Sequence, residues 1–112
     1  MSKEIVEVLI DLNLVNDTFT LNPSAVKEMC KGFASAWRLE CPECMETDKE
    51  FWSITPTDRL IVVLTAAISM ELQDYIPPET ISKVLPTMVK IDREVIKACE
   101  EGLKEGWFNT SV

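Results

Sequence analysis

Residues 60–72, LIVVLTAAISMEL, form the most apolar stretch of the chain, interrupted only by Thr65, Ser69 and Glu71. A helix that is apolar around almost its whole circumference is normally buried on every side. The stretch is too short to cross a bilayer, which needs about 20 apolar residues. It therefore predicts a buried central helix around which the rest of a soluble domain packs, without a membrane span.

The residues on either side of this stretch predict where the central helix begins and ends. Thr55 is an N-cap residue, Pro56 suits the first helical position, and Asp58 stands three residues after the cap, as in a capping box. Residues 77–78 are both proline, and a helix usually ends before such a pair. The central helix is therefore expected to span residues 56–75.

Four further segments place apolar residues at helical spacing, and they predict helices over residues 3–12, 22–39, 78–85 and 86–106. Pro86 either breaks the helix before it or starts the last helix as its first residue. Gly32 lies inside the second of these helices and is expected to permit a close helix crossing. The same helix carries a stripe that is expected to face the core, formed by Val26, Met29, Cys30, Phe33 and Trp37.

Residues 12–21, LNLVNDTFTL, alternate apolar and polar on both sides of Asn16-Asp17, a pair that favours turns. They predict a short two-stranded hairpin, with an irregular loop as the alternative. The chain of 112 residues, 46% of them apolar, is long enough for one domain with a proper core. The predicted fold is an all-α single domain, residues 1–112, with about five helices around the central one, an acidic loop at 40–53 and a frayed tail at 109–112.

The excess of acidic over basic residues limits which classes of molecule this chain is expected to bind. The chain has 19 acidic and 11 basic residues, for a formal net charge of −8. Nonspecific nucleic-acid binding depends on Lys and Arg that neutralise phosphates, so a nucleic-acid partner is unlikely on this composition. A basic protein surface fits better. The N-terminus lacks an apolar signal segment, which predicts a cytoplasmic protein with reduced cysteines.

Cys41 and Cys44 have the C-P-x-C spacing of a zinc knuckle, in which two thiolates hold one metal ion. A structural zinc site needs two more ligands, and the candidates are Cys30 and Cys99 or the same pair of a second subunit. Cys30 and Cys99 lie on apolar helix stripes, where a free thiol commonly serves as a small core residue. The alternatives are a redox pair, or two ordinary thiols in an acidic loop. We expect no cofactor, with zinc as the alternative.

Residues 73–85, QDYIPPETISKVL, resemble a helix-turn-helix: a helix ends, a tight turn follows and a second helix opens. The region offers only Lys83, Lys90 and Arg93 for phosphates. A plain helical hairpin within the bundle is the favoured interpretation, given the acidic balance.

The acidic loop ends in two adjacent aromatic residues. Aromatic side chains inside a polar rim are typical of protein-binding hot spots, so this segment would suit a partner with a basic or apolar groove. The alternative is that the aromatic rings cap the open end of the bundle. The candidate protein-binding residues are Glu43, Glu46, Asp48, Glu50, Phe51 and Trp52.

The sequence marks no catalytic pair. It contains no histidine, the commonest general base, and its three glycines are too few for a nucleotide-binding loop. We therefore expect not an enzyme but a noncatalytic protein-interaction module, a small regulator, adaptor or inhibitor of a larger protein machine. We also expect a homo-oligomer, because a small bundle has difficulty burying the central helix within one subunit. A zinc-knuckle or helix-turn-helix regulator is the alternative, and a small CxxC enzyme or redox protein is third.

Overall fold

The computed structural model describes residues 4–40, 50–72 and 76–108. The described residues form five helices of seven residues or more, and residues 50–53 add a short helical segment. The long helices are α1 (Ile5–Asp11), α2 (Pro23–Glu40), α4 (Pro56–Glu71), α5 (Pro78–Met88) and α6 (Arg93–Phe108). The predicted all-α bundle of about five helices is confirmed.

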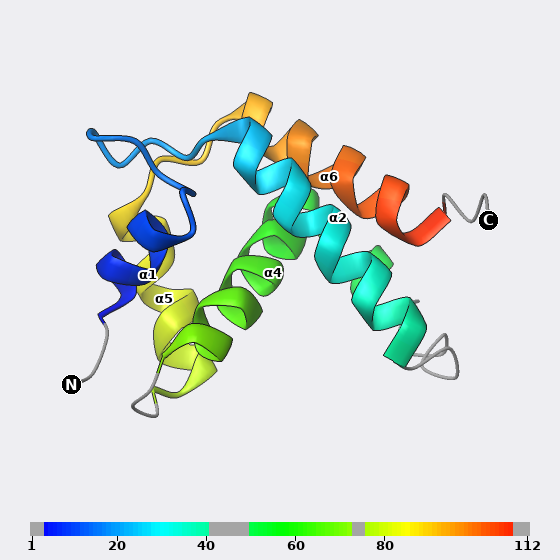
Figure 1. Cartoon of the computed structure of the whole chain (residues 1–112), viewed down its shortest axis with the longest axis horizontal. Coiled ribbons are helices and arrows are strands. Elements are labelled where there is room, and N and C mark those ends of the chain that lie inside the picture. Colours follow the sequence, from blue (N-terminus) through cyan, green and yellow to red (C-terminus); the bar gives the residue numbers. More distant parts are fainter. Residues whose placement is uncertain (1–3, 41–49, 73–75, 109–112) are drawn as a thin grey trace.

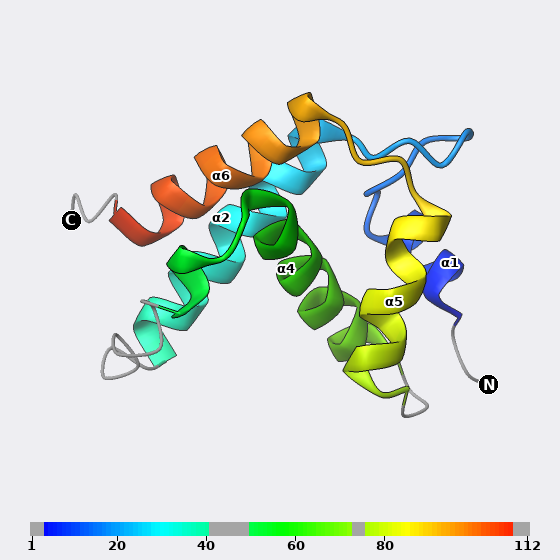
Figure 2. The same cartoon turned by 180° about the vertical axis from the view of Figure 1, so that it is seen from behind.

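The helices form an arch. Helices α2 and α6 lie side by side in one arm, α1 and α5 make the other, and α4 runs diagonally between them (Figures 1 and 2). The radius of gyration of 13.8 Å is close to the value of about 13 Å expected for a compact chain of this length. Helix α4 packs against α5, α6 and α1, whereas α2 packs along α6. Helices α2 and α4 therefore diverge as two separate walls.

Two glycines of α6 bring its backbone against that of α2. A Cβ atom built on Gly102 would lie 2.3 Å from the carbonyl oxygen of Lys27, and one on Gly106 would lie 2.2 Å from that of Lys31. Gly32, by contrast, has nothing within 4 Å of its Cβ position. The expectation that Gly32 permits a close crossing is therefore wrong, since the crossing is made by the glycines of the opposite helix.

The core gathers around α4, but it does not enclose that helix. Leu60, Val63, Leu64 and Ile68 are fully buried among apolar residues of the other four long helices. On the flank of α4 towards α5, Val62 is 43% exposed, and on the flank towards α2, Met70 is 85% exposed. The prediction that residues 60–72 are buried on every side is therefore wrong, because α2 packs on α6 and leaves one flank of α4 uncovered.

The predicted N-terminal cap of α4 is confirmed, because the backbone N–H of Asp58 donates to Oγ1 of Thr55 at 3.1 Å. The helix ends at Glu71 rather than at residue 75, and residues 73–75 lie outside the described residues. None of the described helices is both long enough and apolar enough to cross a membrane.

Residues 12–21 form an irregular loop and not a hairpin of two strands. Only one antiparallel bridge, between Val15 and Leu21, joins the two halves, and the described residues contain no strand. The Asn16 side chain accepts hydrogen bonds from the backbone N–H groups of Thr18 and Thr20, which folds the segment locally. Such side-chain bonds compete with strand pairing, so the alternative of a loop is the correct one.

The boundary between the last two helices also differs from the prediction. Helix α5 continues through Pro86 to Met88, so Pro86 neither breaks it nor starts the next helix. Helix α6 begins at Arg93, where the Asp92 side chain accepts a hydrogen bond from the N–H of Val95 at 3.1 Å. Pro86 has no backbone N–H, so it removes one hydrogen bond of the helix, the one to the carbonyl oxygen of Ser82, and leaves the others in place. The aspartate cap then fixes the start of α6.

Candidate interaction surface

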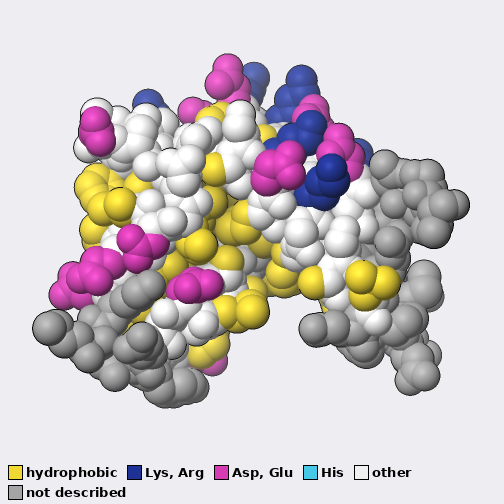
Figure 3. All heavy atoms as spheres, viewed as in Figure 1, with side chains coloured by type: hydrophobic (Ala, Val, Ile, Leu, Met, Phe, Trp, Pro, Cys, Tyr) yellow, Lys and Arg dark blue, Asp and Glu magenta, His cyan; other side chains and the backbone are white. Residues whose placement is uncertain are grey.

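A groove lies between the diverging helices α2 and α4. Its volume is about 570 Å³, and seven residues line it: Met29, Gly32, Phe33, Ala36, Trp37, Ala67 and Met70. None of these carries a charge. Figure 3 shows hydrophobic side chains gathered in this notch between the two arms. We call this feature the α2/α4 groove.

The aromatic wall of the groove continues into the short helical segment 50–53. The ring centroids of Phe33 and Trp37 are 5.8 Å apart, and the edge-on pair of Trp37 and Phe51 is 5.3 Å apart. Phe51 then meets Trp52 edge-on at 5.1 Å. Tilted and edge-on aromatic pairs of this kind stabilise each other by about 0.5–1.5 kcal/mol beyond burial. The four rings therefore form one continuous aromatic cluster along this wall.

Arg59 holds the segment 50–55 against α6. Its guanidinium makes a two-point contact with the Glu100 carboxylate, in which Nε donates to Oε2 at 3.0 Å and Nη2 donates to Oε1. Nη1 donates to the carbonyl oxygens of Trp52, at 3.0 Å, and of Ile54. The hydrogen bond to Glu100 raises the pKa of Arg59 despite burial, which would lower it. The cation is thus permanent, and it fixes the end of the aromatic wall.

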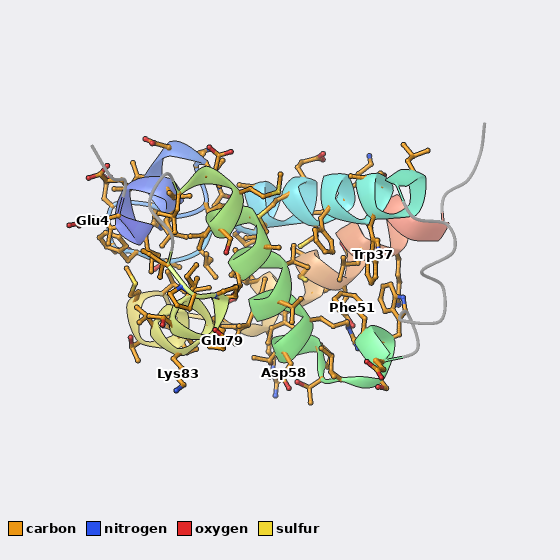
Figure 4. The ribbon with its side chains drawn as sticks, turned by 90° about the horizontal axis from the view of Figure 1, so that it is seen from below. Glu4, Trp37, Phe51, Asp58, Glu79 and Lys83 are labelled. Carbon is orange, nitrogen blue, oxygen red and sulfur yellow. The ribbon has the colours of Figure 1, made fainter. Side chains whose placement is uncertain are left out.

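A second apolar groove flanks α4 on its other side, towards α5. It is lined by Ile61, Val62, Thr65, Ala66, Ser69, Pro78, Glu79 and Ser82. The hydroxyl oxygens of Thr65 and Ser69 are buried and have no hydrogen-bond partner in the structure. Figure 4 views the molecule from below and shows α4 running between its two neighbours. Trp37 and Phe51 lie on the α2 side of α4, and Glu79 lies on the α5 side. Helix α4 is therefore an apolar ridge between two grooves.

Helical spacing places Glu28 and Glu71 at the edges of the α2/α4 groove, next to residues that line it, while Lys27 and Lys31 pair with carboxylates of α6. Glu28 is exposed one helical turn before Gly32, and Glu71 is exposed one turn after Ala67. On the far side of α2, Lys27 Nζ lies 3.6 Å from Glu101 and 3.3 Å from Glu105, and Lys31 Nζ lies 4.0 Å from Glu105. Figure 3 shows Lys and Arg mixed with acidic side chains over α2 and α6, and further acidic side chains along the opposite flank of the notch.

The predicted docking residues divide into three groups. Glu43, Glu46 and Asp48 lie outside the described residues. Glu50 is exposed and Trp52 is half-buried. Phe51 is only 9% exposed and belongs to the hydrophobic core, as expected of a ring that caps the open end of the bundle. The docking role of this set stays a prediction.

Of the four predicted zinc ligands, the described residues include only Cys30 and Cys99, and these two thiols lie side by side. Cys41 and Cys44 lie outside the described residues. Cys30 and Cys99 are buried between α2 and α6, where the Cys30 thiol donates to Sγ of Cys99 at 3.4 Å. This hydrogen bond and burial raise the pKa of Cys30 far above its ordinary value of 9.0. The described residues contain no cluster of three or more side chains that could hold a metal ion.

The segment with the outline of a helix-turn-helix joins α4 to α5. Residues 73–75 lie outside the described residues, and α5 buries Ile81 and Leu85 against the core. Lys83, Lys90 and Arg93 are exposed. This is the helical hairpin within the bundle that the acidic composition favoured, and DNA binding by it stays untested.

Sequence reasoning missed the α2/α4 groove. Its aromatic and methionine residues were assigned to a core-facing stripe, and Val26 and Cys30 of that stripe are indeed buried. One signal in the sequence could have indicated the groove. Gly32 has no side chain and stands next to the apolar stripe that contains Met29, so it leaves room on this helix for a side chain of a binding partner.

Comparison of the chain with models of protein families, with curated proteins and with solved structures found no match.

Proposed function

We propose that this chain is a noncatalytic protein-interaction module, a small cytoplasmic regulator, adaptor or inhibitor, and that the α2/α4 groove is its interaction surface. The observation that carries the proposal is the uncovered flank of α4, where Met70 is 85% exposed beside half-buried aromatic rings of α2. Contiguous apolar surface of this kind mostly marks sites that bind protein or membrane. None of the described helices fits a membrane span.

The chemistry of the groove supports binding rather than catalysis. Its lining consists of aliphatic, aromatic and methionine side chains, and none of them titrates or is a nucleophile. Methionine side chains adapt to different apolar partners because they are unbranched and flexible. A surface with this composition can hold an apolar anchor and release it again, as an adaptor or inhibitor must.

Paired substitutions test the proposal. Met70→Glu puts a charge into the groove, and Ile10→Glu puts one at another apolar position that is 56% exposed. We expect crosslinking in cells to attach a defined partner to the parent chain and to the Ile10→Glu control, but not to Met70→Glu. Identical crosslinks for all three proteins would contradict the groove as the interaction surface.

Self-association stays a prediction of the sequence. Sedimentation equilibrium over a wide concentration range measures it directly. If a dimer forms through this groove, Met70→Glu will shift it to monomer and Ile10→Glu will not.

A further inference from the structure

We infer that the α2/α4 groove receives a basic amphipathic α-helix of another protein, an inference that rests on the proposed function above. The helix lays an apolar stripe along the groove and places Lys or Arg side chains beside Glu28 and Glu71.

The shape favours a helix. Both walls of the groove are helices that diverge from one another, and helix surfaces accept the side-chain ridges of a third helix. A β-strand of a partner would bind by pairing with the edge of a sheet, and the described residues form no sheet. Met29, Phe33 and Met70 offer adaptable and flat apolar surfaces to anchors spaced three or four residues apart on a partner helix.

The charges favour a basic partner. Glu28 continues the row of α2 that contains the groove residues Gly32 and Ala36, and Glu71 continues the row of α4 that contains Ala67. Lys27 and Lys31 pair with carboxylates of α6 on the other side of α2, so neither neutralises these edges. The formal net charge of −8 attracts a cationic segment over a longer range.

The same charges disfavour a second copy as the occupant. A symmetric dimer through this groove would bring the carboxylates of one copy towards those of the other. It would also join two chains that each carry a net charge of −8. Like charges placed across an interface suppress association, so the groove is better suited to a foreign helix.

Three synthetic helices serve as probes. Each helix has about 18 residues and the same stripe of leucines. The polar face consists of lysine in the first helix, glutamine in the second and glutamate in the third. Their fluorescence anisotropy is measured with the parent chain at low and high salt. Glu28→Lys/Glu71→Lys reverses the edge charges. Asp17→Lys/Glu94→Lys is the matched control, since it changes the net charge equally at two exposed positions away from the groove. Circular dichroism verifies that every variant folds.

We expect the lysine helix to bind best, and high salt to weaken it because surface charge pairs are screened. Glu28→Lys/Glu71→Lys should weaken the affinity for the lysine helix roughly three- to tenfold. The matched control Asp17→Lys/Glu94→Lys should weaken this affinity much less. Equal binding of all three helices, abolished by Met70→Glu, would overturn the basic partner but keep the interaction module. A Met70-dependent dimer that binds no helix would make a second copy the occupant and overturn the inference. A monomeric protein that binds none of the three helices would refute both the basic-helix inference and the groove as an interaction surface.

Discussion

Gly102 is the position where one added methyl group most directly tests the packing of the fold. A Cβ atom there would lie 2.3 Å from the Lys27 carbonyl oxygen, and ordinary contacts begin near 3.4 Å, so α2 and α6 would have to separate by about 1 Å. The obstacle is backbone and cannot rotate away. We therefore expect Gly102→Ala to cost about 3 kcal/mol in overpacking, offset by about 1 kcal/mol of improved helix propensity.

Gly32→Ala is the matched control, because it makes the same change in the partner helix. Nothing lies within 4 Å of the new Cβ atom, so only the propensity gain of about 1 kcal/mol remains. The two variants should then differ by about 3 kcal/mol in the free energy of unfolding, with opposite signs relative to the parent chain.

Urea denaturation under reducing conditions, followed by circular dichroism, measures both effects. With a slope of about 1.5 kcal/mol/M, Gly102→Ala should lower the midpoint by about 1.3 M and Gly32→Ala should raise it by about 0.7 M. Equal or greater stability of Gly102→Ala would refute the backbone contact between α2 and α6. Gly106→Ala tests the same contact between α2 and α6 at a second position, because a Cβ atom there would lie 2.2 Å from the Lys31 carbonyl oxygen. It should also lower the urea midpoint.

Three further predictions concern charge and cysteine chemistry. Glu100→Ala leaves the Arg59 guanidinium buried without its carboxylate partner and should lower the free energy of unfolding by about 2 kcal/mol. Breaking a fully buried ion pair costs ~3–5 kcal/mol, and the loss is smaller here because the Glu100 side chain is 21% exposed. An unchanged urea midpoint would contradict this prediction. The raised pKa of Cys30 means that the unfolded thiol ionises first, so the contribution of this thiol to stability should be constant below pH 9.0 and fall above it by up to about 1.4 kcal/mol per pH unit. Denaturation between pH 7 and about 10.5 checks this, and Cys30→Ala should reduce the slope. If Cys41 and Cys44 hold zinc, native mass spectrometry before and after a chelator should show the loss of one metal ion per subunit or per dimer; an unchanged mass would leave these residues as plain thiols.

Local signals of the sequence were sufficient to predict where the helices lie. The Thr55 cap and the proline after it act within one turn, so the start of α4 is determined by residues that are neighbours in the chain. The start of α5 at Pro78 follows from the same kind of signal. Pro86 misled the prediction because a proline removes only one helical hydrogen bond. Burial of Ile81 and Leu85 in the core holds the helix together across it, and the local pattern does not reveal that burial.

Capping, proline placement and apolar periodicity act over a few residues, so the helical class of the chain and most helix boundaries can be predicted from the amino-acid sequence. Which face of each helix is covered depends on how distant segments pack together. Gly32 and Gly102 look alike in sequence, yet one lines an open groove and the other meets a backbone. The physical reason is that α2 packs along α6, a contact between segments about 70 residues apart, as the bond from Cys30 to Cys99 shows. That choice of neighbour leaves α4 exposed along one flank and so creates the candidate interaction surface.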